Sequence, residues 1–390
     1  MKKDLVIIPS VAVWIVGDKF AFDRKFYDGM LMYSDLWPGS MRCILRVSNE
    51  PFPEFEVVYF SQDELSFEIL LLQKKELVRD QHIRGAVIVL ASGDAYDQLH
   101  ISSLSCKAEI KCVYVIENIV ETRYQITKLE TKNLLLLARR YFFIWNTERK
   151  RQVAFQLADG LQTNGVPAYK AYGSITDSLL YFDTRVTEKM LVTTPQLNQR
   201  LKQMYNRSKL HLAYSGRLIS MKGADQLVEL ADYLRTLDIE FHLHIFGVGD
   251  LFMQITNDIK KHSLTSFVTL HGSIGFNKEL IPAIRKNIDL YILPHRQSDP
   301  SCTYLETLSC GIPIVGYNNK AFSGLLDKAD IGWQCDLGNI RSVAETIVNI
   351  SLDRKVISNK SHQALSLARL HDFNETYKRR VEQLIRLSRV

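Results

Sequence analysis

Short apolar runs alternate along the whole chain with stretches in which apolar residues recur at helical spacing. In the first half we predict strands at residues 4–8, 43–47, 56–60, 86–90, 111–116 and 141–145. In the second half we predict strands at residues 210–214, 241–246, 267–270, 288–293 and 312–316. Continuous apolar strands that alternate with helical segments are typical of parallel sheets. The pattern therefore predicts an α/β fold.

The same pattern indicates two doubly wound, Rossmann-like domains that face a cleft. Residues 303–310 and 223–236 are predicted helices, and an amphipathic helix with a basic face is expected at about 374–388. Residues 165–207 have weak periodicity and are our candidate for the connection between the domains. We therefore expect a first domain at 1–190, a second at 208–370 and a final helix at 371–390, a division that the length of 390 residues allows. Such folds bind ligands at the carboxyl ends of their strands.

Composition and charge narrow the class of partner. With 46% hydrophobic and 24% charged residues, the chain has the composition of a globular protein. The net charge of +6 suits a phosphate-bearing ligand or an anionic membrane surface and is too small to indicate nucleic acid. The six cysteines lack the spacing of a metal site, so we expect reduced thiols, no structural zinc and a cytoplasmic location.

Two stretches resemble targeting or membrane segments. The opening MKKDLVIIPSVAVWIVG has two lysines and an apolar run, but Asp4 and Pro9 interrupt it, so we predict a buried first strand with its turn rather than a signal peptide. The sequence contains no uninterrupted run of ~18 apolar residues, so we expect no transmembrane helix. The stretch QITKLETKNLLLLARR at 125–140 is a predicted helix. It could rest on the anionic inner face of a membrane as a peripheral contact, or it could be a core helix with solvated ends.

The candidate chemistry lies in the second half. In SDPSCTYLETLSCGIP, Ser301 is a predicted N-cap, which would direct the backbone N–H groups of Cys302, Thr303 and Tyr304 toward an anion. Glu306, one turn further on, could accept hydrogen bonds from vicinal hydroxyls such as those of a ribose. The alternative is an ordinary capped helix with one solvated glutamate.

Glycines and cations follow the preceding strands. In AYSGRLISMKG, Gly216 and Arg217 come directly after a strand and Lys222 follows five residues later, a pair of cations that suits a diphosphate. Gly247 and Gly249 end the next strand, and Gly272 and Ile274 follow the one beyond it. The glycines would permit a ligand to approach the backbone closely.

These motifs together resemble the donor-binding half of GT-B glycosyltransferases, specifically glycosyltransferase family 4, also called glycosyl transferases group 1. The resemblance is specific over residues 205–350 and looser in the first half, at VYVIEN and LQTNGVP. It implies a final helix that packs on the first, acceptor-binding domain. It also implies that Arg217 and Lys222 bind the donor diphosphate, that Glu306 holds the ribose, and that the N–H groups around Cys302 and Thr303 hold phosphate. Gly216, Gly247, Gly249, Gly272 and Ile274 would border the nucleotide.

Two positions depart from the family pattern. Where the family has a first glutamate that contacts the donor sugar, this chain has Ser298 with Asp299 beside it, so Asp299 is our candidate substitute. Where many members have a histidine after a strand of the first domain, this chain has Glu117. Glu117 could contact the sugar, act as a base for the acceptor hydroxyl, or lie on the surface without a catalytic role. A base at this position would permit inversion, whereas the family implies retention.

The resemblance predicts a metal-independent hexosyltransferase of surface polysaccharide biosynthesis, with a nucleotide diphosphate sugar such as a UDP-sugar as substrate and no cofactor. The acceptor would be a glycan or a lipid-linked glycan, as in lipopolysaccharide. Two alternatives stay open: a non-catalytic partner that binds nucleotide sugar or glycan, and another GT-B enzyme of sugar nucleotides, such as an epimerase or a sugar-phosphate synthase. Four further residues are ambiguous from sequence: Asp183 and Arg185 could line the cleft or pair with each other, and His295 and Arg296 lie on the site loop.

Overall fold

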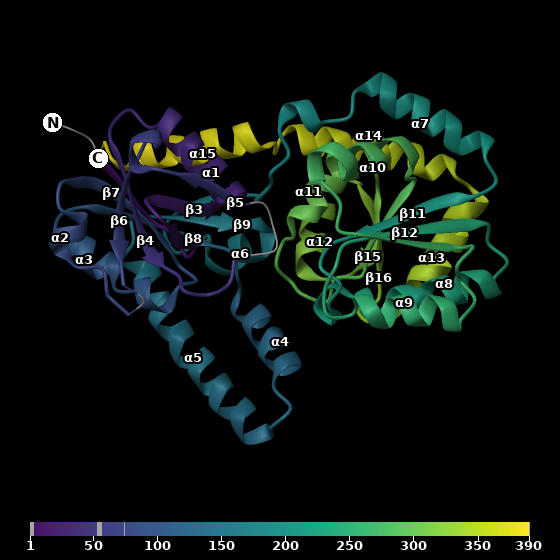
Figure 1. The fold of residues 1–390 in the computed structure, drawn as a ribbon, viewed down its shortest axis with the longest axis horizontal. Coiled ribbons are helices and arrows are strands. Elements are labelled where there is room, and N and C mark those ends of the chain that lie inside the picture. Colours follow the sequence, from purple (N-terminus) through teal and green to yellow (C-terminus); the bar gives the residue numbers. More distant parts are fainter. Residues whose placement is uncertain (1–3, 53–56, 74, 390) are drawn as a thin grey trace. The chain divides into compact units, whose positions relative to one another are not determined.

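The computed structural model describes residues 4–52, 57–73 and 75–389 and divides into two compact units (Figure 1). The first unit comprises residues 1–127, 131–181 and 374–390, and the second comprises residues 128–130 and 182–373. Each unit contains its own sheet of mostly parallel strands with helices packed on it, so the predicted α/β class is confirmed.

The sheet of the first unit has the strand order β10-β9-β8-β7-β1-β4-β2-β3-β5, with β6 paired to β4. All pairs are parallel except β2 with β3 and β3 with β5. The strands are β1 (Asp4–Ile8), β2 (Ala12–Val16), β3 (Lys19–Asp23), β4 (Met41–Val47), β5 (Val57–Phe60), β6 (Glu68–Leu72), β7 (Ala86–Ser92), β8 (Lys111–Ile116), β9 (Gly160–Asn164) and β10 (Asp177–Tyr181).

Helices bury apolar residues on both faces of this sheet. One cluster joins the sheet to α1 (Arg24–Leu36) and α15 (Phe373–Leu387). The other joins it to α2 (Asp80–Ile83), α3 (Ile101–Lys107), α6 (Gly165–Tyr172) and the last turns of α5 (Leu134–Gln156). The remaining helix, α4 (Val120–Glu130), precedes α5 in the chain. Because both faces are covered, the central strands consist of continuous apolar runs.

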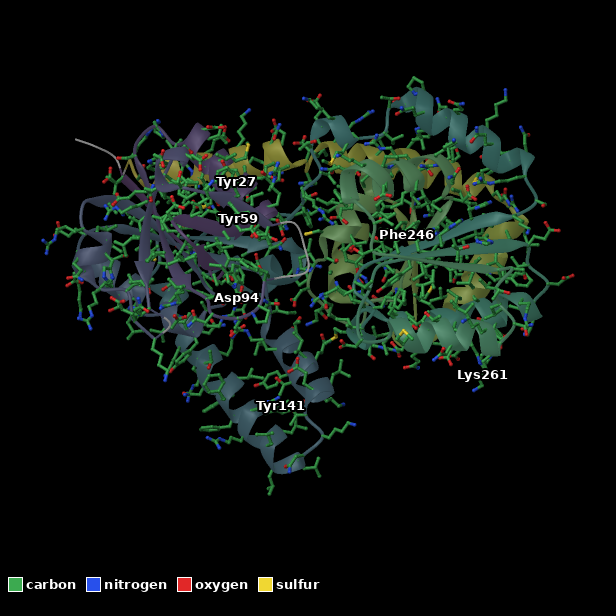
Figure 2. All side chains as sticks on the ribbon, in the orientation of Figure 1. Tyr27, Tyr59, Asp94, Tyr141, Phe246 and Lys261 are labelled. Atoms are coloured by element: carbon green, nitrogen blue, oxygen red, sulfur yellow. The ribbon has the colours of Figure 1, made fainter. Side chains whose placement is uncertain are left out.

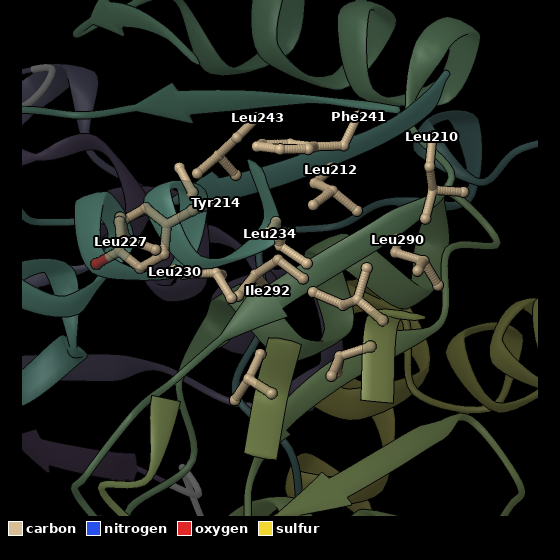
Figure 3. Packing of buried hydrophobic residues seen from close by; sticks show 14 of the residues in the cluster. Leu210, Leu212, Tyr214, Leu227, Leu230, Leu234, Phe241, Leu243, Leu290 and Ile292 are labelled. Carbon is tan, nitrogen blue, oxygen red and sulfur yellow. The ribbon is translucent and has the colours of Figure 1, made fainter. Parts of the chain in front are cut away.

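The second unit has a sheet of six parallel strands in the order β13-β12-β11-β14-β15-β16. They are β11 (Leu210–Ser215), β12 (Phe241–Phe246), β13 (Val268–Gly272), β14 (Leu290–Leu293), β15 (Ile314–Tyr317) and β16 (Gly332–Cys335). The helices are α7 (Thr194–Asn206), α8 (Leu227–Thr236), α9 (Phe252–Lys261), α10 (Ile281–Asn287), α11 (Cys302–Ser309), α12 (Lys320–Leu326), α13 (Ile340–Leu352) and α14 (Lys355–Arg369). Figure 3 shows leucines of β11, β12 and α8 interdigitating in the core of this unit.

Most of the predicted strands are confirmed. β1, β4, β5, β7 and β8 lie where the first half predicted them, apart from residue 56, which is outside the described residues. β11 to β15 coincide with the five strands predicted in the second half, within two residues at each end. The helices predicted at 303–310 and 374–388 correspond to α11 and α15. The predicted helix 223–236 begins with a short 3-10 turn at Ala224–Gln226 before α8.

Two predictions in the first half are wrong. Residues 141–145, predicted as a strand, lie within α5, because a short apolar run does not distinguish a strand from part of a long helix. The helix predicted at 125–140 is two helices, α4 and α5, separated by residues 131–133. The sequence reading also overlooked the β2–β3 hairpin, in which Val16 pairs with Lys19 across a two-residue turn that contains Gly17. A glycine turn between two apolar runs is a hairpin signal.

The segment 165–207, read as a connection, contains regular structure. It includes α6, β10 and α7, and the division between the two units falls within it, after Tyr181. The weak periodicity reflects short elements with partly exposed residues, such as β10 at the edge of its sheet.

The C-terminal helix α15 is fixed to the first unit by a buried polar pair. The Arg380 Nε donates to the Oε1 of Gln162 at 2.8 Å, and the Gln162 Nε2 donates to the Arg380 carbonyl at 3.0 Å. The Arg380 guanidinium also lies 4.2 Å from the ring centre of Tyr181. Because Gln162 is fully buried, loss of its partner leaves an unsatisfied amide inside the unit.

We therefore expect Arg380→Ala to destabilise the protein by about 2–4 kcal/mol, since it removes a buried guanidinium and leaves the buried Gln162 Oε1 without its donor, while the bond to the Arg380 backbone carbonyl remains. Urea denaturation measures the loss. Lys378→Ala, two positions away on the exposed side of α15, is the matched control and should be nearly neutral. Equal midpoints for the two variants would contradict the assigned role of Arg380.

Candidate functional site

The topology of the second unit gives its sheet one switch point. From β11 the chain moves to β12 and β13 on one side, whereas β14 lies on the other side and leads to β15 and β16. All strands are parallel, so their carboxyl ends share one edge of the sheet. The loops after β11 and β14 therefore meet at the point where α/β sheets bind ligands.

All four predicted glycines have backbone conformations that other residues rarely adopt. Gly216, Gly247 and Gly249 have φ values of 147°, 129° and 155°. A Cβ at Gly247 would lie 2.0 Å from the Gly216 carbonyl oxygen, and one at Gly249 would lie 2.7 Å from the Leu218 nitrogen. Contact between the loops therefore explains the requirement for glycine at 247 and 249. A Cβ at Gly216 would meet no atom nearer than 3.6 Å.

The loops after β11 and β14 are also tied to each other. Gly223 has φ of 71°, and a Cβ there would lie 2.1 Å from the Pro294 carbonyl oxygen. The Arg296 backbone N–H donates to the Met221 carbonyl at 3.0 Å. The Arg296 guanidinium donates to both carboxylate oxygens of Asp225, at 2.7 and 2.8 Å. Arg296 thus serves to hold the two loops together.

Lys222 is a partly buried cation on the first of these two loops. Burial lowers its pKa to about 8, and the charge of Arg217 acts in the same direction, while Cys302, Asp299 and Glu306 raise it. The structure therefore brings Lys222 together with four residues that the sequence singled out. Among the described residues, none accepts a hydrogen bond from the Lys222 ammonium group. Such a cation is suited to an anionic ligand, which would stabilise its charged form.

Helix α11 begins as predicted, with Ser301 as its N-cap. The Ser301 hydroxyl accepts from the Thr303 N–H at 3.4 Å, and the Tyr304 N–H donates to the Ser301 carbonyl at 3.0 Å. Two of the three N–H groups assigned to an anion thus already have acceptors within the protein. A phosphate at this helix end would have to replace the Ser301 hydroxyl, which forms the longer of the two bonds.

Glu306 lies in the second turn of α11 and is paired with Arg185. The Arg185 Nε donates to the Glu306 Oε1 at 2.8 Å, and the guanidinium lies 3.6 Å from the ring centre of Phe276. Asp183 accepts a hydrogen bond from the Cys302 thiol at 3.4 Å. Asp183 and Arg185 therefore both contact α11. Glu306 is buried, so the alternative of a solvated glutamate does not hold.

His295, which follows β14, is buried with neither ring nitrogen hydrogen-bonded to any described residue. Burial and the nearby Lys222 lower its pKa well below the usual range, so its ring stays neutral. The ring packs edge-on against Tyr304, with 5.6 Å between the ring centres. An unsatisfied buried imidazole beside a partly buried lysine is typical of a ligand site.

The remaining predicted positions of the second unit lie on the same edge. Gly272 has φ of 71° with open space around its Cβ position, and Ile274 follows it two residues later. Asp299 and Ser298 are both buried in the loop before α11. A buried carboxylate therefore stands one position after Ser298 in this loop.

In the first unit, Glu117 follows β8 directly and is exposed. Its backbone N–H donates to the carboxylate of Asp94 at 2.6 Å. Asp94, labelled in Figure 2, also accepts from the fully buried Arg151 at 3.0 Å. The sequence reading missed both residues, although Asp94 follows the predicted strand 86–90 and could have been noticed there. Arg151 gave no signal, because a single arginine within a helix is ordinary.

Four histidines form a row on one face of β11, β12 and β13. His211 lies 3.3 Å from His244, and His244 lies 3.1 Å from His271, measured between ring nitrogens. Partial burial lowers the pKa of His211 to about 4. In the part of the chain that the structure describes, no group of three or more histidine, cysteine or acidic side chains is arranged to hold a metal ion.

Comparison with known proteins finds matches to the second unit. Residues 197–366 match the family model described as glycosyl transferases group 1. A glycogen synthase of Thermotoga petrophila is 27% identical over 157 residues, which are 40% of this chain and 31% of that protein. N-acetyl-alpha-D-glucosaminyl L-malate synthase of Bacillus anthracis is 22% identical over 127 residues, 33% of this chain and 32% of that protein. The matched region thus spans about a third of the length of each curated relative.

Solved structures resemble the whole chain. HepE of Anabaena in complex with UDP has a TM-score of 0.68 at 11% identity and covers 98% of this chain and 99% of its own. The lipopolysaccharide outer core galactosyltransferase WaaB in its apo form has a TM-score of 0.67 at 13% identity, with 99% and 100% covered. WaaG, a glycosyltransferase involved in lipopolysaccharide biosynthesis, has a TM-score of 0.62 at 13% identity, with 97% and 99% covered.

At these identities the structures show the fold alone. The chain has the two-sheet α/β fold of GT-B glycosyltransferases, and its residues 197–366 match the glycosyl transferases group 1.

Proposed function

We propose that this protein transfers a hexosyl group from a nucleotide diphosphate sugar to a glycan or lipid-linked glycan acceptor, with retention and without a metal ion. The observation that carries the proposal is the environment of Lys222. Its partly buried ammonium group is brought together with Arg217, Asp299 and Glu306 at the switch point of a parallel sheet. The site lies within the region that matches the group 1 glycosyltransferases.

The structural relatives support the choice of donor and acceptor. HepE of Anabaena has been solved with UDP and with UDP-glucose, which favours a uridine diphosphate sugar as the donor here. WaaG and WaaB belong to lipopolysaccharide synthesis, which favours a surface polysaccharide as the product.

In the proposed reaction the bond between the sugar's anomeric carbon and the diphosphate breaks, and the nucleoside diphosphate leaves with the bonding electrons. The acceptor hydroxyl oxygen bonds to the anomeric carbon and gives up its proton, either to the oxygen of the departing diphosphate or to the Glu117 carboxylate. Arg217 and Lys222 stabilise the charge that develops on the diphosphate, which requires no movement of groups that are already in place. The linked loops after β11 and β14 fix the backbone from which both side chains extend.

The other candidate residues have positioning roles in this proposal. Glu306 accepts hydrogen bonds from the ribose, and Asp299 accepts from hydroxyls of the donor sugar. The neutral His295 ring donates one hydrogen bond to the ligand, which satisfies a nitrogen that has no partner in the described protein. Glu117 is the candidate carboxylate of the first unit, as a sugar contact or as the group that receives the acceptor's proton.

A non-catalytic protein that binds nucleotide sugar is the second candidate, because Ser298 stands at the position of the family's first glutamate. Binding of a nucleoside diphosphate with no transfer or hydrolysis of its sugar would favour this candidate. Both candidates require the same donor site, so binding experiments test the site and turnover separates the functions.

Removal of either cation should weaken donor binding and slow transfer. We expect Arg217→Ala and Lys222→Ala to weaken UDP binding at least about tenfold and to lower turnover ~10²- to 10³-fold, because each removes a charge from the diphosphate site. Calorimetric titration with UDP, GDP and ADP also identifies the base. Lys261→Ala, on α9 of the same unit and outside these loops, is the control and should bind as wild type. Wild-type affinity in both site variants would sink the assignment.

The lowered pKa of Lys222 predicts a specific pH dependence. Below pH 8 the amine is charged, and above its pKa of about 8 it loses the charge that attracts the diphosphate. The diphosphate itself titrates near pH 6, so its own charge is constant in this range. Affinity for UDP should therefore fall between about pH 7 and pH 9, with proton uptake on binding near pH 8. Titrations in buffers of different ionisation enthalpy measure the uptake, and an equal slope in Lys222→Ala would contradict the prediction.

Glu306→Gln separates recognition of the ribose from recognition of the phosphates. Because Gln is a weaker acceptor for two hydroxyls, we expect UDP to bind about tenfold more weakly while pyrophosphate binds as before. Calorimetry with both ligands measures the difference. Equal losses for UDP and pyrophosphate would show that Glu306 acts on the phosphate site as a whole and not on the ribose.

A further inference from the structure

Helices α4 and α5 form a hairpin that extends from the first unit (Figure 1). Tyr124 of α4 packs edge-on against Tyr141 of α5, with 4.9 Å between the ring centres. The Arg140 guanidinium donates to the Thr131 hydroxyl at 2.7 Å. We call residues 131–146 the hairpin tip; it comprises the turn between the helices and the first part of α5.

The hairpin tip exposes an unusual number of large apolar side chains. Leu134 is 79% exposed, Leu135 is 85% exposed and Phe142 is 66% exposed. Leu136, Phe143 and Trp145 are also exposed. Tyr124, Tyr141, Phe142 and Trp145 line a shallow surface hollow of about 550 Å³ with almost purely apolar walls. A contiguous apolar surface of this kind indicates a binding surface rather than scattered exposed residues.

The packing of α5 explains which side is left exposed. Ile144, Thr147 and Arg151 are buried and form one stripe at helical spacing. Phe142 and Leu135 are separated by seven residues, so they share the opposite face. The exposed apolar residues therefore belong to the side of α5 that its own unit leaves uncovered, and Figure 2 shows Tyr141 on this hairpin.

The charges of the hairpin tip all have one sign. The sequence TKNLLLLARRYFFIWN contains Lys132, Arg139 and Arg140 and no acidic residue. One turn beyond the tip, the Arg149 guanidinium lies 4.6 Å from the ring centre of Trp145. The hairpin thus carries leucines at its end, followed along α5 by cations and a tryptophan. Segments at a lipid interface have this arrangement, in which the apolar side chains enter the acyl region and the cations contact the headgroups.

Two backbone N–H groups at the start of α5 already have hydrogen-bond acceptors within the protein. The Asn133 side chain accepts from the Leu135 and Leu136 N–H groups at 3.0 and 3.1 Å. These donors would otherwise lose their water on insertion at a large cost. No helix in the described part of the chain has the length and apolar character to cross a bilayer. The surface is thus suited to partial insertion.

We propose that the hairpin tip docks on an anionic lipid surface, with Leu134 and Leu135 inserted among the acyl chains and Lys132, Arg139 and Arg140 at the headgroups. Charge complementarity selects this occupant over a second copy of the chain, because two copies would bring their cations together at the apolar contact. The inference rests on the first unit alone and does not depend on the proposed donor site.

Sedimentation with vesicles tests the docking on the full chain. We expect binding to vesicles of equal parts phosphatidylglycerol and phosphatidylcholine and at least about tenfold weaker binding to phosphatidylcholine alone, because the cations contribute only on the anionic surface. Binding should also weaken as salt is raised from about 50 to about 500 mM, because salt screens the attraction between the cations and the anionic surface over this range. Equal binding to both vesicle types, or none to either, would overturn the proposal.

Variants of the hairpin tip identify the surface. Leu134→Ser with Leu135→Ser should weaken binding to anionic vesicles at least about tenfold, since both side chains are expected to leave water on docking. Arg139→Glu should have a comparable effect through charge. Leu352→Ser is the matched control, because Leu352 is 80% exposed on α13 of the other unit. Unchanged melting temperatures show that the variants are folded.

Two further readouts keep this inference apart from the donor site. The double leucine variant should bind UDP like wild type, so a loss of UDP binding in Lys222→Ala and a loss of vesicle binding in the leucine variant report separate surfaces. Analytical ultracentrifugation tests the rival occupant. Concentration-dependent dimers that the leucine variant abolishes, together with no vesicle binding, would overturn the proposal and assign the surface to a second copy of the chain.

Discussion

The contact between the loops after β11 and β14 is the constraint on which the candidate site depends. Gly223 permits the Pro294 carbonyl to approach its backbone, and Arg296 joins the two loops through Asp225. Lys222 lies between these attachments and is partly buried there, which lowers the pKa of its ammonium group. The sheet topology explains where this contact forms. β11 and β14 are parallel neighbours, and the chain leads from β11 to strands on one side of the sheet and from β14 to strands on the other side. The partly buried charge is thus a consequence of loop packing on a switch point.

The sequence predicted those parts of the fold that depend on continuous apolar runs. β7 and β8 were recognised because both faces of a parallel sheet are covered, which leaves their residues apolar without interruption. Residues 141–145 have the same local character, yet they belong to α5, in which Phe142 and Phe143 are exposed. An apolar run of five residues does not determine whether its side chains will pack between helices on a sheet or face solvent. The flanking Asn133 cap and the 23-residue length of α5 are what decide its conformation.

The candidate site was predictable only where its chemistry is local in sequence. Ser301 as an N-cap is a property of one turn, and the structure contains it. The pairing of Glu306 with Arg185 joins residues 121 apart, and Asp94 with Arg151 joins residues 57 apart. Neither pattern has a sequence period, because tertiary packing alone brings these partners together. The glycines show a further limit: their positive φ values were foreseeable, but Gly247 and Gly249 make room for a neighbouring loop.

Two cations of this protein, the fully buried Arg151 and the partly buried Lys222, show how function can be separated from stability. The fully buried Arg151 donates to Asp94, Glu148, Tyr172 and two backbone carbonyls, so its charge is compensated within the protein. Lys222 has no such set of acceptors among the described residues, and burial lowers its pKa. A compensated buried charge stabilises a particular arrangement of loops, whereas an uncompensated one costs free energy until an anion arrives. Selection for folding alone would replace such a lysine by an apolar residue. Its presence beside the unsatisfied imidazole of His295 therefore indicates a site that is completed by its ligand.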